Sequence, residues 1–200
     1  MSAREDILAR VHRNRPSGDH TLPPIPRFDI AGAQHARLET FSRTLQAMGG
    51  RFCRSSEISS PVTWIREHIP HAKIICSAVP EVPSDRPWSA VRKPQDLADV
   101  DVAVVRAVMG VAESGSVLFT EAELKVNTLA YLAQHLVVLL DENAIVSGLQ
   151  EAYTHPVFQT ARYAVFHTGP SATADIEGVL IHGAQGVRSL TVIVDGCGPI

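Results

Sequence analysis

The sequence predicts a single α/β domain built on an open, largely parallel β-sheet with helices on both faces. Segments of strand composition alternate along the chain with segments of helical periodicity, an order typical of α/β proteins. Several strand segments, such as 136–140, are apolar throughout, which is typical of strands covered on both faces. The 200 residues suffice to bury the core of one such domain.

Charge and hydropathy exclude several classes of partner. The 18 Lys and Arg against 21 Asp and Glu leave a net charge of −3, so there is no basic excess for nucleic acid or anionic lipid. The longest strongly apolar run, 136–140, is far shorter than the about 20 residues that cross a bilayer. The N-terminus is charged and leads into a helical pattern, not into an apolar signal core. We therefore expect a cytoplasmic protein that binds neither nucleic acid nor membrane.

Residues 1–30 are predicted to form an N-terminal arm, and residues 31–200 the α/β domain. The arm begins with an amphipathic helix over 3–13, which has Ile7, Leu8 and Val11 on one face. Four prolines between residues 14 and 27 then predict an extended connector, because proline lacks the amide donor that a helix needs. We expect the helix to pack on a neighbouring molecule or on the domain.

Within the domain, periodicity and composition predict the order of elements. The helical segments are 33–48, 62–68, 145–153 and one that begins near Thr173. The strand segments are 51–54, 72–78, 100–108, 116–119, 136–140, 163–167 and 189–194. A proline-rich loop over 77–96 contains Trp88, and loops of this length often cover a functional site.

A carboxylate flanked by glycines lies between two of these strands, in Gly-Val-Ala-Glu-Ser-Gly-Ser at 110–116. Glycine lets the backbone approach a ligand closely. Glu113 is predicted to project from the rim of the sheet, where it could act as base, metal ligand or nucleophile. Ser114 and Gly115 are candidate ligand-binding residues beside it. Spacing alone favours the alternative, a tight turn whose acid is solvated.

The second candidate segment, 168–177, follows the strand at 163–167 and predicts the start of a helix. After the turn at Gly169, Ser171 or Thr173 could cap this helix, and free amides at its start could bind an anion. Asp175, with a second acid two residues later, competes for the same positive potential and favours self-capping. A small-anion or carboxylate site and a partner surface are the alternatives.

Other common cofactor motifs are absent from the sequence. It has neither a G-x-G-x-x-G loop nor a Walker loop, and no histidine pair has zinc-helix spacing, so no metal site is predicted. The three cysteines, Cys53, Cys76 and Cys197, lie far apart, unlike iron–sulfur ligands, and are expected to be reduced thiols. His167 and His182 flank the second segment, where a structural role is the favoured interpretation.

The two segments, in this order, resemble those of the lactate-utilization (LUD) family. Residues 112–116 are similar to its A-E-[ST]-G-[ST] segment. Residues 169–177, followed by 183–186 and the last strand, are similar to its long and specific signature G-P-S-x-T-A-D-I-E…G-x-x-G. One departure is Gln185, where members of the family often carry histidine.

The resemblance implies a fold related to ribose-5-phosphate isomerase and CoA-transferases, and a part in the oxidation of L-lactate to pyruvate. Companion proteins of that system carry the iron–sulfur clusters. The chain is therefore expected to be a non-redox subunit or accessory protein without a cofactor of its own. It would bind the iron–sulfur subunits of a lactate-oxidising complex, a small carboxylate, or a second copy of itself as a homo-oligomer.

Two alternatives stay open. A stand-alone enzyme would act on a small acyl-CoA or sugar-phosphate substrate through Glu113, by analogy with the glutamate nucleophile of CoA-transferases; a shared fold does not fix that function. A regulatory sensor of lactate is the third interpretation.

Overall fold

A computed structural model describes residues 2–18, 21, 23–24, 34–173, 181–182 and 185–196. Its centre is a five-stranded sheet in the order β1-β11-β6-β3-β2, in which every neighbouring pair is parallel. These strands are β1 (Arg51–Arg54), β2 (Ile75–Ser77), β3 (Val102–Arg106), β6 (His135–Asp141) and β11 (Ser189–Asp195). The predicted α/β class with a largely parallel sheet is confirmed.

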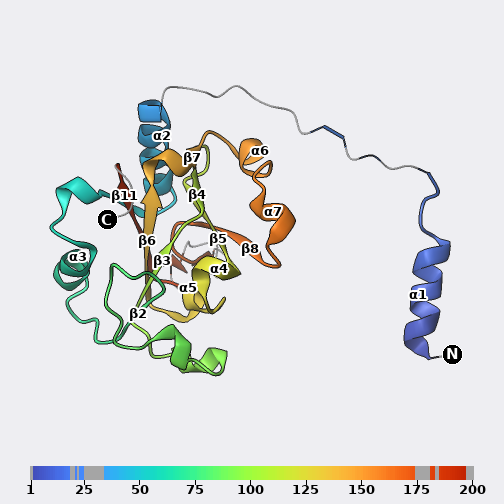
Figure 1. Cartoon of the computed structure of the whole chain (residues 1–200), viewed down its shortest axis with the longest axis horizontal. Coiled ribbons are helices and arrows are strands. Elements are labelled where there is room, and N and C mark those ends of the chain that lie inside the picture. Colours follow the sequence, from blue (N-terminus) through green and yellow to red (C-terminus); the bar gives the residue numbers. More distant parts are fainter. Residues whose placement is uncertain are drawn as a thin grey trace.

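A second sheet of four strands, which the sequence did not predict as a separate unit, lies beside the first (Figure 1). Its order is β7-β4-β5-β8, and only the β7–β4 pair is parallel. The strands are β4 (Met109–Val111), β5 (Ser116–Thr120), β7 (Ile145–Val146) and β8 (Ala164–Thr168). The short helices α4 (Glu121–Leu124) and α5 (Leu129–Leu132) connect the second sheet to the first, whereas α6 (Leu149–Ala152) and α7 (Val157–Thr160) connect β7 to β8 within the second sheet.

Three longer helices confirm the predictions for the first half of the chain. They are α1 (Ala3–Arg13), α2 (Gln34–Ala47) and α3 (Pro61–His68). Helix α3 begins where the sequence signals it, because the Ser60 hydroxyl accepts the amide of Thr63 and proline occupies the first turn. Helix α2 ends at Ala47, and Gly49 two residues later has a φ of 82°, which suits glycine. One-turn 3₁₀ helices occupy Ser55–Glu57, Trp88–Ala90, Pro94–Leu97 and Glu142–Ala144.

The helix predicted for 145–153 is wrong in its first half. Residues Ile145 and Val146 form β7 and pair with Gly110 and Val111 of β4, and only then does the one-turn helix α6 follow. Pairing with a distant strand outweighs the local helical periodicity here.

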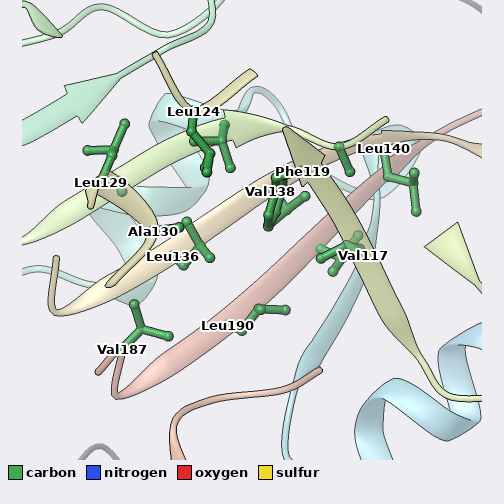
Figure 2. Close-up of a cluster of buried hydrophobic side chains, with 14 of the residues drawn as sticks. Val117, Phe119, Leu124, Leu129, Ala130, Leu136, Val138, Leu140, Val187 and Leu190 are labelled. Carbon is green, nitrogen blue, oxygen red and sulfur yellow. The ribbon is translucent and has the colours of Figure 1, made fainter. Parts of the chain in front are cut away.

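Both faces of the central sheet are covered, as predicted. Along β3, Ala103 and Val105 contribute to one core cluster, whereas Val102 and Val104 contribute to another. The larger cluster joins the sheet to α2, α4, α5 and the second sheet, and Figure 2 shows side chains of β5, α4 and α5 meeting those of β6 and β11. Helix α3 covers the opposite face through Trp64.

Helix α1 stands apart from the two sheets in Figure 1, and none of its residues is buried. Its N-terminus carries a reciprocal capping box between Ser2 and Glu5. The apolar face predicted for it is exposed, at 61% for Ile7 and 60% for Val11. Packing on the domain is therefore not observed, and packing on a neighbouring molecule stays a prediction. Among the described helices, none is long and apolar enough to cross a membrane.

Candidate functional site

The first candidate segment, 110–116, contains the turn of the hairpin between β4 and β5. Gly115 lies in this turn with a φ of 69°, in the left-handed region that favours glycine. A Cβ there would lie 2.3 Å from the backbone nitrogen of Leu45, so the hairpin rests directly on α2 only because residue 115 is glycine. The Thr44 hydroxyl adds a hydrogen bond of 2.7 Å to the carbonyl of Ala112. Gly115 therefore serves the packing of the hairpin on α2.

Glu113 is exposed at the end of this hairpin, not at the rim of the parallel sheet as predicted. The reason is that the strands on either side of it pair with each other in the second sheet. Its carboxylate oxygen Oε2 accepts the amide of Leu149, the first residue of α6, at 3.1 Å. Its own amide donates to the carbonyl of Ser147 at 3.0 Å. The carboxylate thus holds α6 to the hairpin, and its roles as base, nucleophile or metal ligand stay predictions.

A row of three hydroxyl groups joins the two candidate segments. The Ser116 Oγ lies 2.7 Å from Oγ of Ser114 and 2.5 Å from Oγ1 of Thr168. Ser116 and Thr168 are cross-strand partners on β5 and β8, so the register of the second sheet sets this contact. Two motifs that are far apart in sequence therefore meet.

The second segment rests on the same helix end as the first. Gly169 is buried and has a φ of 66°. A Cβ at this position would lie 2.1 Å from the carbonyl oxygen of Met48, just beyond α2. The glycines of both motifs therefore permit close contact with residues 44–48.

The helix predicted to begin near Thr173 does not include Ala172 or Thr173, and residues 174–180, over which it would run, lie outside the described residues. Residues Ala172–Thr173 form strand β9, which pairs antiparallel with β10, Ile181–His182. The amide of Ser171 donates to the carbonyl of Val187 at 2.9 Å, and Gly186 lies against the Ser171 side chain. Asp175 lies outside the described residues, so its predicted role is untested.

A cavity of about 300 Å³ opens beside this second segment. We call it the His167 cavity; its walls come from Tyr131 of α5, from β8 and the turn after it through Ser171, and from residues 185–187. Tyr131 and Gln185 are exposed, whereas Gly169 is buried, so the cavity runs inward from the surface. Its volume is at the lower end of the about 300–1,000 Å³ of small-molecule sites. Of the predicted site residues, Gly169 and Ser171 line it, whereas Glu113, Ser114, Gly115 and Thr173 do not.

His167 is the one histidine among the residues described as lining this cavity. Its ring packs between Phe119, with centroids 5.4 Å apart, and Tyr131, with centroids 5.0 Å apart. Nε2 is buried, and no described residue gives it a hydrogen-bond partner. This burial lowers the pKa of His167 to about 4, so the imidazole is neutral at physiological pH. The sequence placed His167 beside the motif but favoured a structural role. Its unsatisfied nitrogen makes it a candidate for a ligand contact.

Two tyrosines that the sequence analysis did not single out lie here: Tyr131 lines the cavity, and Tyr163 contacts Tyr131 from the start of the strand segment that leads into β8. The hydroxyl groups of Tyr131 and Tyr163 form a hydrogen bond, and burial, together with this bond, raises the pKa of Tyr131. Glu121 fixes this arrangement, because its carboxylate accepts the amides of Arg162 and Tyr163 at 2.9 and 3.0 Å. No local sequence signal relates Tyr131 to β8.

Potential metal and thiol ligands do not gather at this site. Within residues 34–173 and the other described parts, no group of three or more His, Cys, Asp or Glu is arranged to hold a metal ion. Burial raises the pKa of the free thiols of Cys53 and Cys76. Cys197 lies outside the described residues.

A sequence model of the LUD domain matches residues 38–194. The chain belongs to the LUD-domain family. The matched LUD region contains both motif segments and the His167 cavity, and it leaves α1 outside.

Over 113 residues, this LUD-domain chain is 31% identical to "Lactate utilization protein C" of Geobacillus sp. (strain WCH70). The match covers 53% of the chain and 47% of that protein, so it spans about half the length of this relative. The fold is similar to the crystal structure of a DUF162 family protein from Deinococcus radiodurans, with a TM-score of 0.59 and 16% identity. That likeness covers 83% of the LUD-domain chain and 100% of the solved one, and it shows the fold alone.

Proposed function

We propose that this LUD domain serves lactate utilization as a non-redox component that binds a small carboxylate in the His167 cavity. The similarity to a protein named for lactate utilization supports the setting. The observation that carries the binding role is the buried Nε2 of His167, which has no partner among the described residues. A buried polar atom without a partner lowers the stability of the folded state by about 1–3 kcal/mol. Such an atom in a native structure therefore needs an explanation, and a contact with a ligand is one.

The chemistry of the cavity suits a short hydroxy or oxo acid. Ser171, Gln185, Thr168 and Tyr131 line it together with His167, so side chains that can donate and accept hydrogen bonds stand among apolar lining residues. Lactate and pyruvate offer one carboxylate and one further oxygen, which matches a few polar groups in a small space.

We assign the redox step to iron–sulfur proteins with which this chain assembles, and this part of the proposal rests on the family resemblance. Cytoplasmic location and self-association belong to the same proposal. Gel filtration of the chain alone measures its self-association, and gel filtration with the companion proteins measures the complex with them.

Lactate-dependent dye reduction by the companion iron–sulfur proteins, with and without this chain, tests the function. We expect the rate to rise when the chain is added, and to rise much less with the His167→Phe variant. His135→Gln is the matched control, since His135 is a part-buried histidine that bonds Ser189 outside the cavity. Oxidation at the full rate without the chain contradicts the proposal.

A further inference from the structure

The described walls of the His167 cavity contain one side chain that can become a cation. No Asp, Glu, Lys or Arg occurs among the lining residues that the structure describes. On its own strand β8, His167 is flanked by Phe166 and Thr168, neither of which titrates. Any negative charge that enters the cavity therefore meets His167 as its one potential counter-charge in these walls.

Among the described residues, the elements packed against His167 add no fixed charge. From β5, the facing group is the ring of Phe119, and from α5 it is Tyr131, which bonds the hydroxyl of Tyr163. Burial raises the pKa of Tyr131, so its phenol stays protonated near neutral pH. Residues 185–187, Gln-Gly-Val, carry no titratable group.

A carboxylate cannot enter such a site as a bare anion at low cost. Transfer of an unpaired charge into an apolar environment is strongly unfavourable, and the usual response is neutralisation by a proton. The free protein does not supply that proton, because burial holds the pKa of His167 at about 4. At neutral pH the proton therefore comes from bulk water.

We propose that the His167 cavity takes up one proton from water with each small monocarboxylate that it binds. This inference rests on the proposed function, because it requires a carboxylate ligand. The balance is carboxylate anion plus proton plus free protein giving one neutral complex. Whether the proton resides on the imidazole or on the ligand carboxyl, the stoichiometry is the same, since the two groups titrate as a pair.

The inference also defines the ligand class. A dicarboxylate or a phosphate ester brings a second negative charge, for which the described walls offer no counter-charge. Short monocarboxylates with a hydroxyl or oxo oxygen are therefore preferred over dicarboxylates and sugar phosphates.

Isothermal titration of the full chain with L-lactate between pH 5 and pH 8 tests the proton uptake. We expect the Kd to rise about tenfold for each unit of pH, because one proton is bound with the ligand above the pKa of the free imidazole. Repeating the titration at one pH in two buffers of different ionisation enthalpy counts the protons, and we expect one. Lactamide, which is uncharged but of similar shape, is expected to bind with no pH dependence.

Two variants test whether the pH dependence of binding comes from His167. His167→Gln retains a polar group but cannot be protonated, so it is expected to weaken lactate binding at pH 5 by more than tenfold and lactamide binding much less. His135→Gln is expected to keep the full pH dependence of the unmodified chain.

Two outcomes separate the inference from the function on which it rests. Lactate binding with a constant Kd from pH 5 to pH 8 and no proton uptake overturns the inference and leaves carboxylate binding intact. Binding of succinate as tightly as lactate also overturns it. No binding of lactate or pyruvate even at pH 5 overturns both.

Discussion

The hairpin that carries Glu113 and the cavity that contains His167 are both built from family motifs, yet their polar groups are used differently. In the hairpin, the Glu113 carboxylate holds an amide of α6, and Ser114 and Ser116 form a hydroxyl row. His167, one of the residues that line the cavity, has a buried Nε2 with no partner among the described residues. A motif whose polar groups are satisfied within the protein maintains architecture, whereas an unsatisfied group in a cavity wall is the better candidate for a ligand contact.

The largest effect is expected from a substitution in the hairpin, which maintains the architecture. Gly115→Ala places a Cβ 2.3 Å from the backbone of Leu45 at a positive φ, so the hairpin must move away from α2. We expect the free energy of unfolding to fall by about 3 kcal/mol in urea denaturation.

Gly148→Ala is the control for that experiment, because the φ of −146° at Gly148 is accessible to any residue. Its change should stay below about 1 kcal/mol. Equal losses in the two variants would mean that close contact with α2 is not what residue 115 provides.

The second-largest effect is expected from lowering the pH, which should reduce the stability of the protein through His167 of the cavity. In the native state His167 stays neutral down to pH about 4, whereas in the unfolded chain it takes up a proton near its ordinary pKa of 6.5. The unfolded state therefore binds more protons between these values, and stability falls as the pH drops from 6.5 to 4. The loss due to this residue is at most about 3 kcal/mol.

The measurement is thermal or urea unfolding of the unmodified chain and of His167→Phe across this pH range. Burial, and to a smaller extent Arg188, also lowers the pKa of His135. Because His135 is the same in both proteins, the difference between their pH profiles isolates the contribution of His167. Parallel pH profiles would refute a buried neutral imidazole at position 167.

A smaller and opposite effect is expected from His167→Phe at neutral pH. The phenyl ring suits the contacts with Phe119 and Tyr131 and removes the unsatisfied nitrogen. We expect the variant to be more stable by about 1 kcal/mol in urea and to lose lactate binding. Destabilisation without loss of binding would assign His167 to the architecture instead.

The smallest effect is expected from Glu113→Gln. The amide oxygen of glutamine can still accept the hydrogen bond from Leu149, and the site is exposed, so unfolding should change by less than about 0.5 kcal/mol. Lactate-dependent dye reduction should be unchanged. A large loss of turnover on an acyl-CoA or sugar-phosphate substrate would instead favour the stand-alone enzyme in which Glu113 is the nucleophile.

The inner strands of the central sheet, β3, β6 and β11, were predictable because they are buried on both faces. Burial on two sides requires continuous apolar runs, and 136–140 and 189–194 lie within the observed β6 and β11. The short strands β4 and β7 have no such signature. Strand β4 pairs with β5 across the hairpin, but β7 forms because Ile145 and Val146 find partners at Gly110 and Val111, a long-range pairing that no local pattern encodes.

The candidate site was predicted only in part, for the same reason. Gly169 and Ser171 carry a family motif and line the cavity. Tyr131 reaches His167 from another part of the chain, so their contact depends on tertiary structure. At Thr173, where the sequence offered a helix cap, the residue instead pairs with Ile181 in the β9–β10 sheet, and residues 174–180 lie outside the described part of the chain.

The path of the chain between the two sheets has a consequence for how the molecule folds. After β3 the chain enters the second sheet, returns as β6, leaves again for β7 and β8, and returns once more as β11. Neither sheet is a continuous piece of sequence, so neither can form by itself. Docking of the two sheets is thus part of the folding of each, and a chain cut anywhere between β4 and β8 leaves two fragments without a complete sheet. Contacts between distant residues dominate this topology, which predicts one cooperative and comparatively slow transition.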